Sequence, residues 1–575
     1  MASSVFSLQG ATIATAIEVF LIVKLATGID IGLRWIALSV FSINCAIVIL
    51  YNTIVHPDFI SPLRNIAGPK WSLPRITVHR LSSSSTQGEL LLQMARETPN
   101  DGIVALREFT RRRLLVTKPH VLADVLVHRY QDFEKPENMR RFLRNLVGDG
   151  LLMLEGEAHK FMRRSTNPAF NFRRIKDLYP MMWKNSLAFR EVLEADLRAQ
   201  SPAADTPQGS AEVTHWANKI TLNIIGNSLL GKDLNVFGGR EDRLVKSYEV
   251  VFDPSKEMLL YFVLSAWFSH RLANALPWRM RRVFKETTGT LKSICVQMAR
   301  DRREEIKKGA QHVDILTQLI KLEVFSDDEL GDQLLTFLAA GHDTTALTLT
   351  WACYLLALDP ALQGTLRKEV RDNLPSYTQG ESAGDLSADE LAGIMERLPL
   401  LNGVISETLR LYPTVPVSIR TAVRDTTLGG QPIPKDTEIL LSPWVINRSH
   451  ELWGADADSF RPERWISSVV PDGHGGAEGA KEGEKHNGGT ATEGLWYKPN
   501  YTGGASSNYD FLTFLHGPRS CIGQTFARAE LRCLLAAMIS HFEWTLDMDP
   551  KDVIPSGAIT IKPQNGLHLK LRVAK

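Results

Sequence analysis

One cysteine of this chain lies where its neighbours would stabilise the ionised form. In the stretch FLTFLHGPRSCIGQTFARAE, Cys521 lies between Gly517 and Gly523, and a helical pattern begins just after it. The unpaired amides at the start of a helix stabilise a thiolate, which is the form of cysteine that binds metals. Glycine lets the backbone approach the sulfur closely, and Arg519 offers a planar fork to a carboxylate. The stretch fits either a buried cysteine at a helix cap or an axial metal ligand.

The spacing of five residues favours the metal ligand. The pattern F-x-x-G-x-R-x-C-x-G is filled by Phe514, Gly517, Arg519, Cys521 and Gly523. It resembles the haem-binding loop of the cytochrome P450 family, in which a cysteine thiolate is the proximal ligand of the haem iron. The resemblance implies haem b as the cofactor, Cys521 as the iron ligand and Arg519 as the partner of a haem propionate.

A second stretch, AAGHDTTA, interrupts a long apolar helical pattern with polar residues. Gly341 costs such a helix about 1 kcal/mol relative to alanine. One interpretation is a helix kink with a solvated polar face. The other comes from the similarity of this stretch to the distal helix of the P450 family. It implies that Gly341 makes room for dioxygen above the iron, and that Asp343 and Thr344 pass protons to the reduced oxygen. We expect His342 to face away from this pocket.

Three charged residues resemble the buried ion network on the proximal side of the haem in this family. Glu407 and Arg410, in the stretch ETLR, are three residues apart, so they share one face of a helix and can pair. Arg464, in FRPERW, lies in a segment similar to the P-E-R-F segment of the family, with Trp465 in place of phenylalanine. The pattern E-x-x-R alone is common on surface helices. The three residues together imply a structural network rather than a catalytic one.

Buried haem carboxylates need cationic partners or hydrogen-bond donors. The stretch GEAHKFMRRSTNPAF resembles the W-x-x-x-R helix of the family, with His159 in place of tryptophan and Arg163 one turn later. Arg420, in YPTVPVSIRTAVRD, falls where the family places another propionate partner. The resemblance therefore implies Arg163, Arg420 and Arg519 as the anchoring set, with His159 as an additional donor. Each of these residues alone could equally be a surface cation.

The elements that must position these residues are mostly helices. Apolar residues recur at three- and four-residue spacing in LLQMARE, KPHVLADVLVHR, DQLLTFLAAGHDTTALTLTWACYLLAL and LPLLNGVISETLRLYP. Short strand patterns occur in IVALREF, RRRLLVTK, TTLGGQPIPKDTEILLS and GLHLKLRV. We therefore predict a mainly α chain with small β-sheets, which the resemblance identifies as the P450 fold of long helices around a buried haem. The Gly-rich residues 467–508 lack periodicity and predict a flexible surface insert.

The amino-terminal residues predict a membrane anchor. The stretch from Trp35 to Val55 has 21 residues and no charge, close to the roughly 20 that cross a bilayer as a helix. Residues 13–29 form a weaker candidate for an additional span, because Glu18 and Lys24 interrupt them. Positive charges at residues 64–80 favour the cytosolic side. A pair of buried core helices is the alternative interpretation of these two stretches.

The domain prediction follows from this anchor. We assign residues 1–60 to the membrane anchor, 61–84 to a proline-rich connector and 85–575 to the haem-thiolate domain, which carries the Gly-rich insert. We expect the protein in the endoplasmic reticulum membrane, with the catalytic domain facing the cytosol.

Composition excludes several other classes of protein. The chain of 575 residues is 44% hydrophobic, which suffices for a large core, and its net charge of +2 gives no reason to expect nucleic acid as a partner. The five cysteines show no C-x-x-C spacing, which argues against a disulfide framework and a zinc site. We expect most of the chain to lie in a reducing compartment.

The resemblance implies a membrane-anchored haem-thiolate monooxygenase. Such an enzyme inserts one oxygen atom of O2 into a lipophilic small molecule, here a terpenoid, a polyketide or a fatty acid. The Gly-rich insert and Trp465 resemble filamentous-fungal members, many of which act in secondary-metabolite biosynthesis. No G-x-G-x-x-G motif stands out, so electrons must come from outside. The family implies NADPH–cytochrome P450 reductase as the donor, with cytochrome b5 as a further partner. A basic surface would receive the reductase, with these candidates: Lys160, Arg164, Arg528 and Arg532.

Other activities remain open at this point. A haem-thiolate isomerase or dehydratase would need no external electrons, and a fatty-acid hydroxylase would differ only in substrate. A haem carrier or gas sensor would need no proton relay. The pair Asp343 and Thr344 argues against the isomerase, the dehydratase and the carrier, because such proteins have no use for an acid next to a threonine on the distal helix.

Overall fold

The computed structural model describes residues 14–19, 33–69, 72–81, 86–108, 111–238, 279–374, 386–469, 496–557 and 559–575. The chain divides into two compact units. Unit 1 comprises residues 1–83, 90–134 and 419–441, and unit 2 comprises residues 84–89, 135–418 and 442–575.

Unit 1 is built on a five-stranded sheet with the order β1-β2-β8-β5-β3. β1 pairs antiparallel with β2, β2 runs parallel to β8, and β3 is antiparallel to β5. A separate hairpin of β6 and β7 turns at Gly429 and Gly430, which both have positive φ and suit a two-residue hairpin turn. The elements of the unit are α3 (Leu33–Leu50), η1 (Tyr51–Ile60), η2 (Pro62–Asn65), α4 (Ser72–Leu81), α5 (Gln87–Glu97), β1 (Ile103–Glu108), β2 (Arg111–Val116), α6 (Pro119–Ala123), η3 (Asp124–His128), η4 (Tyr130–Asp132), β3 (Phe133–Glu134), β5 (Ser418–Ala422), β6 (Thr426–Leu428), β7 (Gln431–Ile433) and β8 (Glu438–Leu441).

One helix of unit 1 has the length and composition of a membrane span. It covers Leu38–Ile60, has a mean hydropathy of 1.9 and buries none of its apolar window, which is compatible with the predicted anchor. Its end is attached to the sheet, because Asp58 pairs with Arg112 at 2.9 Å and with Arg107 at 3.2 Å. The weaker candidate, residues 13–29, falls largely outside the described residues. Part of the predicted connector is helical, as η2 and α4.

The described part of unit 2 consists mainly of helices, with three small sheets ordered β10-β9, β11-β14-β4 and β12-β13. Its helices are α7 (Glu137–Val147), α8 (Gly156–Thr166), η5 (Asn167–Phe170), α9 (Phe172–Lys176), α10 (Tyr179–Gln200), α11 (Val213–Ile225), η6 (Gly226–Leu230), α15 (Arg279–Lys307), α16 (Ile315–Ile320), α17 (Asp327–Ala357), α18 (Pro360–Asn373), α19 (Ala388–Arg397), α20 (Pro399–Leu411), α21 (Pro443–Ile446), α22 (His450–Trp453), η8 (Pro462–Trp465), η9 (Gly517–Arg519), α23 (Gln524–His541) and η10 (Pro550–Asp552). Its strands are β4 (Gln208–Glu212), β9 (Ile466–Val469), β10 (Trp496–Pro499), β11 (Phe542–Leu546), β12 (Pro555–Ser556), β13 (Lys562–Pro563) and β14 (His568–Val573).

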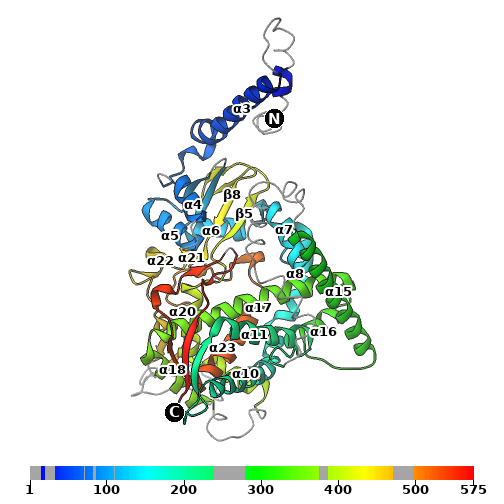
Figure 1. Cartoon of the computed structure of the whole chain (residues 1–575), viewed down its shortest axis with the longest axis vertical. Helices are drawn as coiled ribbons and strands as arrows, with labels where there is room; N and C mark the ends of the chain where they lie inside the picture. The colour runs from blue at the N-terminus through cyan, green and yellow to red at the C-terminus, as the bar shows by residue number, and fades with distance from the viewer. Residues whose placement is uncertain are drawn as a thin grey trace, which may run out of the picture. The chain divides into compact units, whose positions relative to one another are not determined.

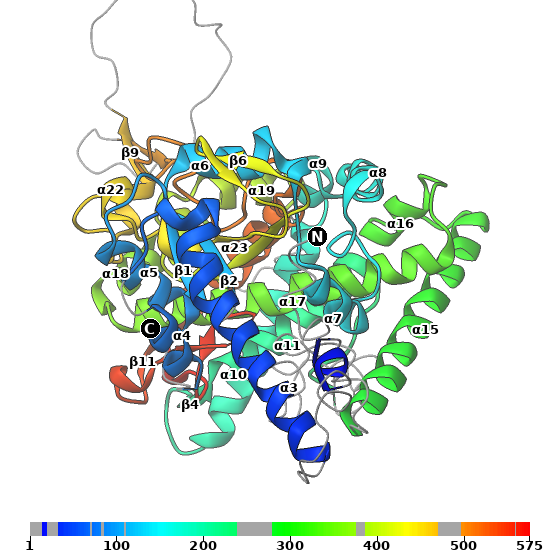
Figure 2. The same ribbon diagram turned by 90° about the horizontal axis from the view of Figure 1, so that it is seen from above.

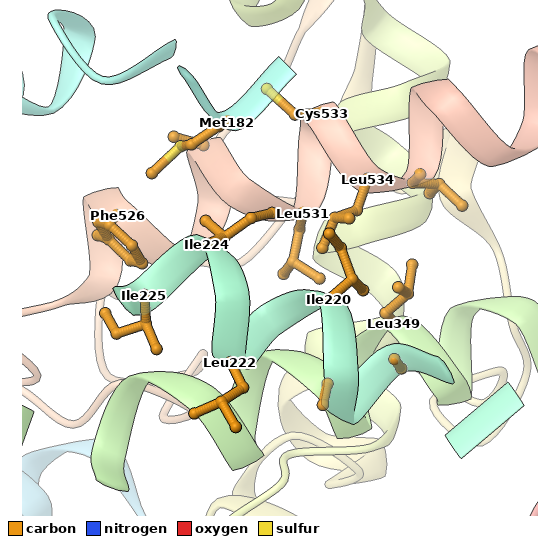
Figure 3. Packing of buried hydrophobic residues seen from close by; sticks show 14 of the residues in the cluster. Met182, Ile220, Leu222, Ile224, Ile225, Leu349, Phe526, Leu531, Cys533 and Leu534 are labelled. Atoms are coloured by element: carbon orange, nitrogen blue, oxygen red, sulfur yellow. The ribbon is translucent and has the colours of Figure 1, made fainter. Parts of the chain in front are cut away.

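The long helix α17 organises unit 2. It begins at a capping box, in which Ser326 and Glu329 each bond the other's backbone amide. α11 and α23 both contact α17, as Figure 1 shows, and α15 packs along it beside α16 (Figure 2). In the core, Ile220 and Ile224 of α11 lie beside Leu531 of α23 (Figure 3). Every residue from 345 to 357 of α17 is buried, so the carboxyl-terminal half of this helix is fixed from all sides.

The prediction of a mainly helical chain with small sheets is confirmed. The predicted strand patterns form β1, β2, β6, β7, β8 and β14. The insert at residues 467–508 was predicted to be a flexible surface insert without periodicity. At its two ends the structure has two short strands that this prediction did not include, β9 and β10, which pair antiparallel with Val469 opposite Trp496. Valine and aromatic residues favour strands, and they flank the Gly-rich centre on both sides. Residues 470–495 lie outside the described residues.

Gly403 on α20 tests how closely this helix must approach η8. A β-carbon at Gly403 would lie 2.6 Å from the carbonyl oxygen of Pro462. Overpacking of this kind costs about 1–3 kcal/mol, so we expect Gly403→Ala to lower the urea midpoint of unfolding. In the control Gly393→Ala on α19, the nearest atom would be 3.9 Å away, and the added helix propensity should stabilise by about 0.5–1 kcal/mol. Equal midpoints for the two variants would contradict this packing.

Candidate active site

The loop before α23 presents Cys521 at the start of a helix. The amide of Cys521 donates to the carbonyl of Phe514 at 2.8 Å and closes the loop. Gly517 has a φ of +71°, a conformation that favours glycine. α23 begins at Gln524, with Gly523 as its N-cap. The amides of Gly523 and Gln524 are hydrogen-bond donors to the cysteine sulfur, so the sulfur lies where the helix amides point.

Cys521 differs from the other cysteines of unit 2. Cys295, Cys353 and Cys533 are buried, and burial raises the pKa of Cys353 to about 12. Cys521 is exposed, although protein atoms surround it densely. That enclosure raises the pKa of its thiol, while the amides of Gly523 and Gln524 and the guanidinium of Arg163 lower it. A metal ligand must be deprotonated, and these three groups favour that state.

Arg163 on α8 lies beside the cysteine loop. Its Nη1 donates to the carbonyl of Ser520 at 2.6 Å, and Nη2 donates to the hydroxyl of the same residue at 3.3 Å. Burial lowers the pKa of Arg163, and the nearby Cys521 opposes that shift. The structure thus brings this predicted site residue to the sulfur. Its interaction with a haem propionate stays a prediction.

Arg519 has a carboxylate partner that the sequence analysis missed. Its guanidinium pairs with Glu155, and its Nη1 donates to the carbonyl of Leu154 at 2.9 Å. Glu155 also accepts from the amide of Lys135 at 3.2 Å and from its Nζ at 3.3 Å. The signal that could have identified Glu155 is its position, because it is an acidic residue directly before the helix that begins at Gly156. Arg519 is therefore oriented by protein groups, and its contact with a propionate remains a prediction.

Two further predicted anchoring residues are buried. His159 lies on α8, one turn before Arg163, and is 6% exposed. Arg420 lies on β5 of unit 1 and donates to the carbonyl of Ile419 at 2.9 Å. Their roles at a haem carboxylate stay predictions.

The centre of α17 is accessible where the predicted distal residues lie. Ala340 is exposed and Asp343 and Thr344 are partly exposed, whereas every later residue of the helix is buried. The Thr344 hydroxyl donates to the carbonyl of Ala340 at 2.8 Å. Such back-bonding slightly destabilises a helix and often bends it. The accessible turn therefore carries two polar groups, the carboxylate of Asp343 and the hydroxyl of Thr344.

Gly341 and His342 both face α11. A β-carbon at Gly341 would lie 2.9 Å from Cδ1 of Ile225, so the glycine allows α17 to pack closely on α11. The ring Nε2 of His342 lies 3.1 Å from the carbonyl of Asn218 on the same helix, which agrees with our expectation for this histidine. Burial lowers the pKa of His342. The role of Gly341 toward dioxygen stays a prediction.

The predicted ion network is assembled in the structure. Arg410 binds Glu407 through two hydrogen bonds of 2.8 Å and 2.7 Å, with both side chains fully buried. Arg464 joins at 3.3 Å from Nε to the same carboxylate. Trp465 adds a bond that phenylalanine could not make, because its indole Nε1 donates to Glu407 at 2.9 Å. The substitution noted in the sequence therefore extends the network.

Asn447 connects this network to the cysteine loop, and sequence reasoning did not identify it. Its carbonyl accepts from Nη1 of Arg410 at 2.6 Å. Its side chain accepts from the amide of Leu512 at 2.8 Å and donates to the hydroxyl of Thr513 at 2.8 Å. The loop that carries Cys521 is thereby attached to α20.

One of the four basic residues predicted for a docking surface, Arg532, is in the wrong place. Arg532 is 3% exposed and binds Glu396 at 2.5 Å. Arg528 lies over the rings of Phe514 and Phe511 and donates to Ser406 at 2.9 Å. Arg532 faces inward because it lies on the packed side of α23, whereas Arg528 is partly exposed and stays a candidate. Lys160 and Arg164 on α8 are exposed, and they remain candidates.

These residues fit a thiolate-bound haem. An exposed thiol with two backbone amides aimed at it supplies an anionic ligand. Arg519 lies on the cysteine loop and Arg163 lies beside it on α8, and both can neutralise carboxylates. Groups of three or more His, Cys, Asp or Glu side chains that could hold a bare metal ion are absent from the described residues.

Comparisons with known proteins point to one family. A family model described as Cytochrome P450 matches residues 80–570. The chain is 36% identical to Cytochrome P450 monooxygenase sphH of Aspergillus fumigatus, over 91% of this chain and 90% of that protein. It is 36% identical to Cytochrome P450 monooxygenase ptmK of Penicillium ochrochloron, over 92% and 97% of the two chains. It is 34% identical to Cytochrome P450 monooxygenase FUM15 of Gibberella moniliformis, over 91% and 90%.

The indole of Trp465 provides a test of the ion network. Trp465→Phe keeps an aromatic ring but removes the donor to the buried carboxylate of Glu407, and a hydrogen bond to a charged group contributes about 1.5–3 kcal/mol. We expect a matching loss of stability in urea unfolding followed by circular dichroism. The control Trp453→Phe removes a 3.1 Å bond to the neutral carbonyl of Asp510, worth only about 1 kcal/mol. A larger effect at residue 453 would contradict the network.

Proposed function

Because the chain belongs to the cytochrome P450 family, we propose that it is a membrane-anchored haem-thiolate monooxygenase that inserts one oxygen atom of O2 into a lipophilic small molecule. The cofactor of this family is haem with a thiolate ligand. The observation that carries the proposal is the exposed Cys521 at the start of α23, where the amides of Gly523 and Gln524 meet its sulfur.

The haem, when bound, supplies the activation of dioxygen, and the protein supplies its ligand, its orientation and its protons. Cys521 would hold the iron. Arg163 and Arg519 would bind the propionates, with Arg420 and His159 as further partners. Thr344 would hold a proton at Oγ1 and exchange it with Asp343, which is replenished from solvent because it is partly exposed. The network of Glu407, Arg410 and Arg464 keeps the proximal side rigid.

The substrate class is inferred from apolar segments that would surround the haem. They are residues 138–152, 252–268, 334–344, 414–417 and 556–560, of which 252–268 lie outside the described residues. Many residues of these segments are apolar, which suits a lipophilic molecule such as a terpenoid, a polyketide or a fatty acid. The relatives named above come from fungi, and this supports a role in secondary-metabolite biosynthesis. A fatty-acid hydroxylase is the second candidate.

Electrons would come from NADPH–cytochrome P450 reductase, with cytochrome b5 as an additional donor. Lys160 and Arg164 are exposed on α8, the helix that also carries Arg163. Cations at this position would attract an acidic partner to the side of the molecule that holds the thiolate. The span at Leu38–Ile60 would hold both proteins in one membrane, which we assign to the endoplasmic reticulum with the catalytic domain in the cytosol.

The reaction itself can be tested with labelled oxygen. Membranes that contain the full chain and a P450 reductase are incubated with NADPH, 18O2 and a panel of terpenoids, polyketides and fatty acids. We expect one labelled oxygen atom in the product and a strict requirement for reductase. Product formed without reductase or without label would instead indicate the isomerase or dehydratase activity, in which no external electrons are used.

Thr344→Val tests the proton path. The variant removes the hydroxyl at the accessible turn of α17. The product formed per O2 consumed should therefore fall by about tenfold or more, which is less than the full contribution of a positioned proton donor to a rate. The peroxide released per O2 consumed should rise. Thr350→Val is a matched control, because it removes the same type of back-bond, 2.9 Å to Ala346, from the buried part of the helix. Unchanged coupling in Thr344→Val would contradict the relay.

A further inference from the structure

The hairpin of β12 and β13 depends on other segments for its position. Its strands have two residues each, and Pro555 lies opposite Pro563. Proline has no backbone N–H, so neither strand can donate a hydrogen bond at this pair. The amide of Gln564 donates to the carbonyl of Ile554 at 2.9 Å and closes the base of the hairpin. A short two-stranded hairpin is only marginally stable by itself, so contacts outside it must fix its place in unit 2.

Ile561, directly before β13, makes such outside contacts with both of its backbone groups. Its amide donates to the carbonyl of Thr414 at 2.9 Å. Its carbonyl accepts from the indole Nε1 of Trp351 at 3.2 Å. Ile561 and Trp351 are both 0% exposed, and a buried backbone group needs a partner inside the protein. One buried residue of the hairpin is thus bonded to α17 and to the segment that follows α20.

Trp351 also contacts the segment after α20 directly. Its ring system stacks on the ring of Tyr412, with a centroid distance of 4.2 Å and an interplanar angle of 12°. Thr414, which accepts from Ile561, follows Tyr412 in the same segment. The indole therefore joins three parts of unit 2, which are α17, residues 412–414 and the hairpin of β12 and β13.

The position of Trp351 on α17 relates this junction to the proposed proton path. Trp351 follows Thr344 on the helix, and the distance between them is about two helical turns. Residues with this spacing lie on the same face of a helix. Residues 414–417 and 556–560 are among the segments that we place around the haem. A shift of the hairpin relative to Trp351 would therefore move one wall of the proposed pocket relative to Thr344.

We propose that Trp351 is a positioning residue for substrate selectivity. The bond from its indole to the carbonyl of Ile561 holds the hairpin of β12 and β13 in one place relative to α17. Its stacking on Tyr412 holds residues 412–414 in the same arrangement. The effect on selectivity rests on the proposed function, whereas the bond and its effect on the hairpin do not.

Hydrogen exchange tests the bond without any turnover. Trp351→Phe keeps an aromatic ring beside Tyr412 but removes the donor to Ile561. Losing one neutral hydrogen bond changes an equilibrium by about fivefold. We therefore expect the backbone amides of residues 554–564 in the haem-loaded full chain to exchange about fivefold faster than in the wild type, measured by mass spectrometry.

Trp544→Phe is the matched control for this measurement. The indole of Trp544 donates to the carbonyl of Cys353 at 2.9 Å, so the variant loses the same type of bond to the same helix. Exchange in residues 554–564 should stay at the wild-type rate. Equal exchange in the wild type and Trp351→Phe, or equal acceleration in the two variants, would overturn the proposal.

A variant of nearly unchanged volume separates the bond from the packing of the ring. Trp351→Phe leaves a cavity, which by itself destabilises a core. Replacing Trp351 by 3-benzothienylalanine exchanges the indole N–H for sulfur and keeps the shape of the two rings. We expect the same faster exchange in residues 554–564 as in Trp351→Phe. Exchange at the wild-type rate would show that the volume of the ring, rather than the bond, holds the hairpin, and would overturn the proposal.

Competition between two substrates tests the role in selectivity. Two compounds that the wild type oxidises are supplied together with reductase, NADPH and O2, and the ratio of their products reports the ratio of the two kcat/KM values. We expect this ratio to change by about fivefold in Trp351→Phe and to stay at the wild-type value in Trp544→Phe, while both variants keep the ferrous–carbon monoxide absorption. An unchanged ratio in Trp351→Phe would overturn the role in selectivity. A chain without monooxygenase activity would form no product here but would still show the faster exchange, so a failure of the proposed function is distinguishable.

Discussion

The charge that the sulfur of Cys521 would carry as an iron ligand constrains much of unit 2. A thiolate in a protein interior is unstable unless dipoles and cations surround it. Here the amides of Gly523 and Gln524 point at Cys521, and the guanidinium of Arg163 lies nearby. These groups can act only if the loop keeps its shape, since a displacement of about 1 Å would already weaken such bonds strongly. The fold must therefore hold the loop that carries Cys521 in a fixed shape.

The loop keeps its shape because it is attached to α20 through a chain of buried polar contacts. Glu407 and Arg410 form a bidentate pair, Arg410 holds the carbonyl of Asn447, and the side chain of Asn447 holds Leu512 and Thr513. Removing one partner of a buried pair leaves an uncompensated charge, which costs about 3–5 kcal/mol. Such a chain is therefore costly to interrupt at any point, and this explains a structural rather than a chemical role for its members.

Sequence reasoning identified the residues of the site better than their partners. Glu407, Arg410 and Arg464 could be found because their spacing has a recognisable pattern. Glu155 and Asn447 could not, since each is a single polar residue whose partner lies far away in the chain. The same reason explains the error for Arg532: its position after the cysteine suggested a surface cation, whereas the face of α23 on which it lies is decided by packing against Tyr179 and Glu396. The strands β9 and β10 were missed because the Gly-rich centre of the insert dominated its composition.

The central claim is that the sulfur of Cys521 binds the haem iron, and carbon monoxide tests it most directly. The purified, haem-loaded chain is reduced, exposed to carbon monoxide and examined by difference spectroscopy. The account predicts the far-shifted Soret absorption of a thiolate-bound ferrous haem in the wild type and in Cys353→Ser, and its absence in Cys521→Ser. A wild-type protein that is folded and haem-loaded but lacks this absorption, or a Cys521→Ser variant that retains it, would contradict the account.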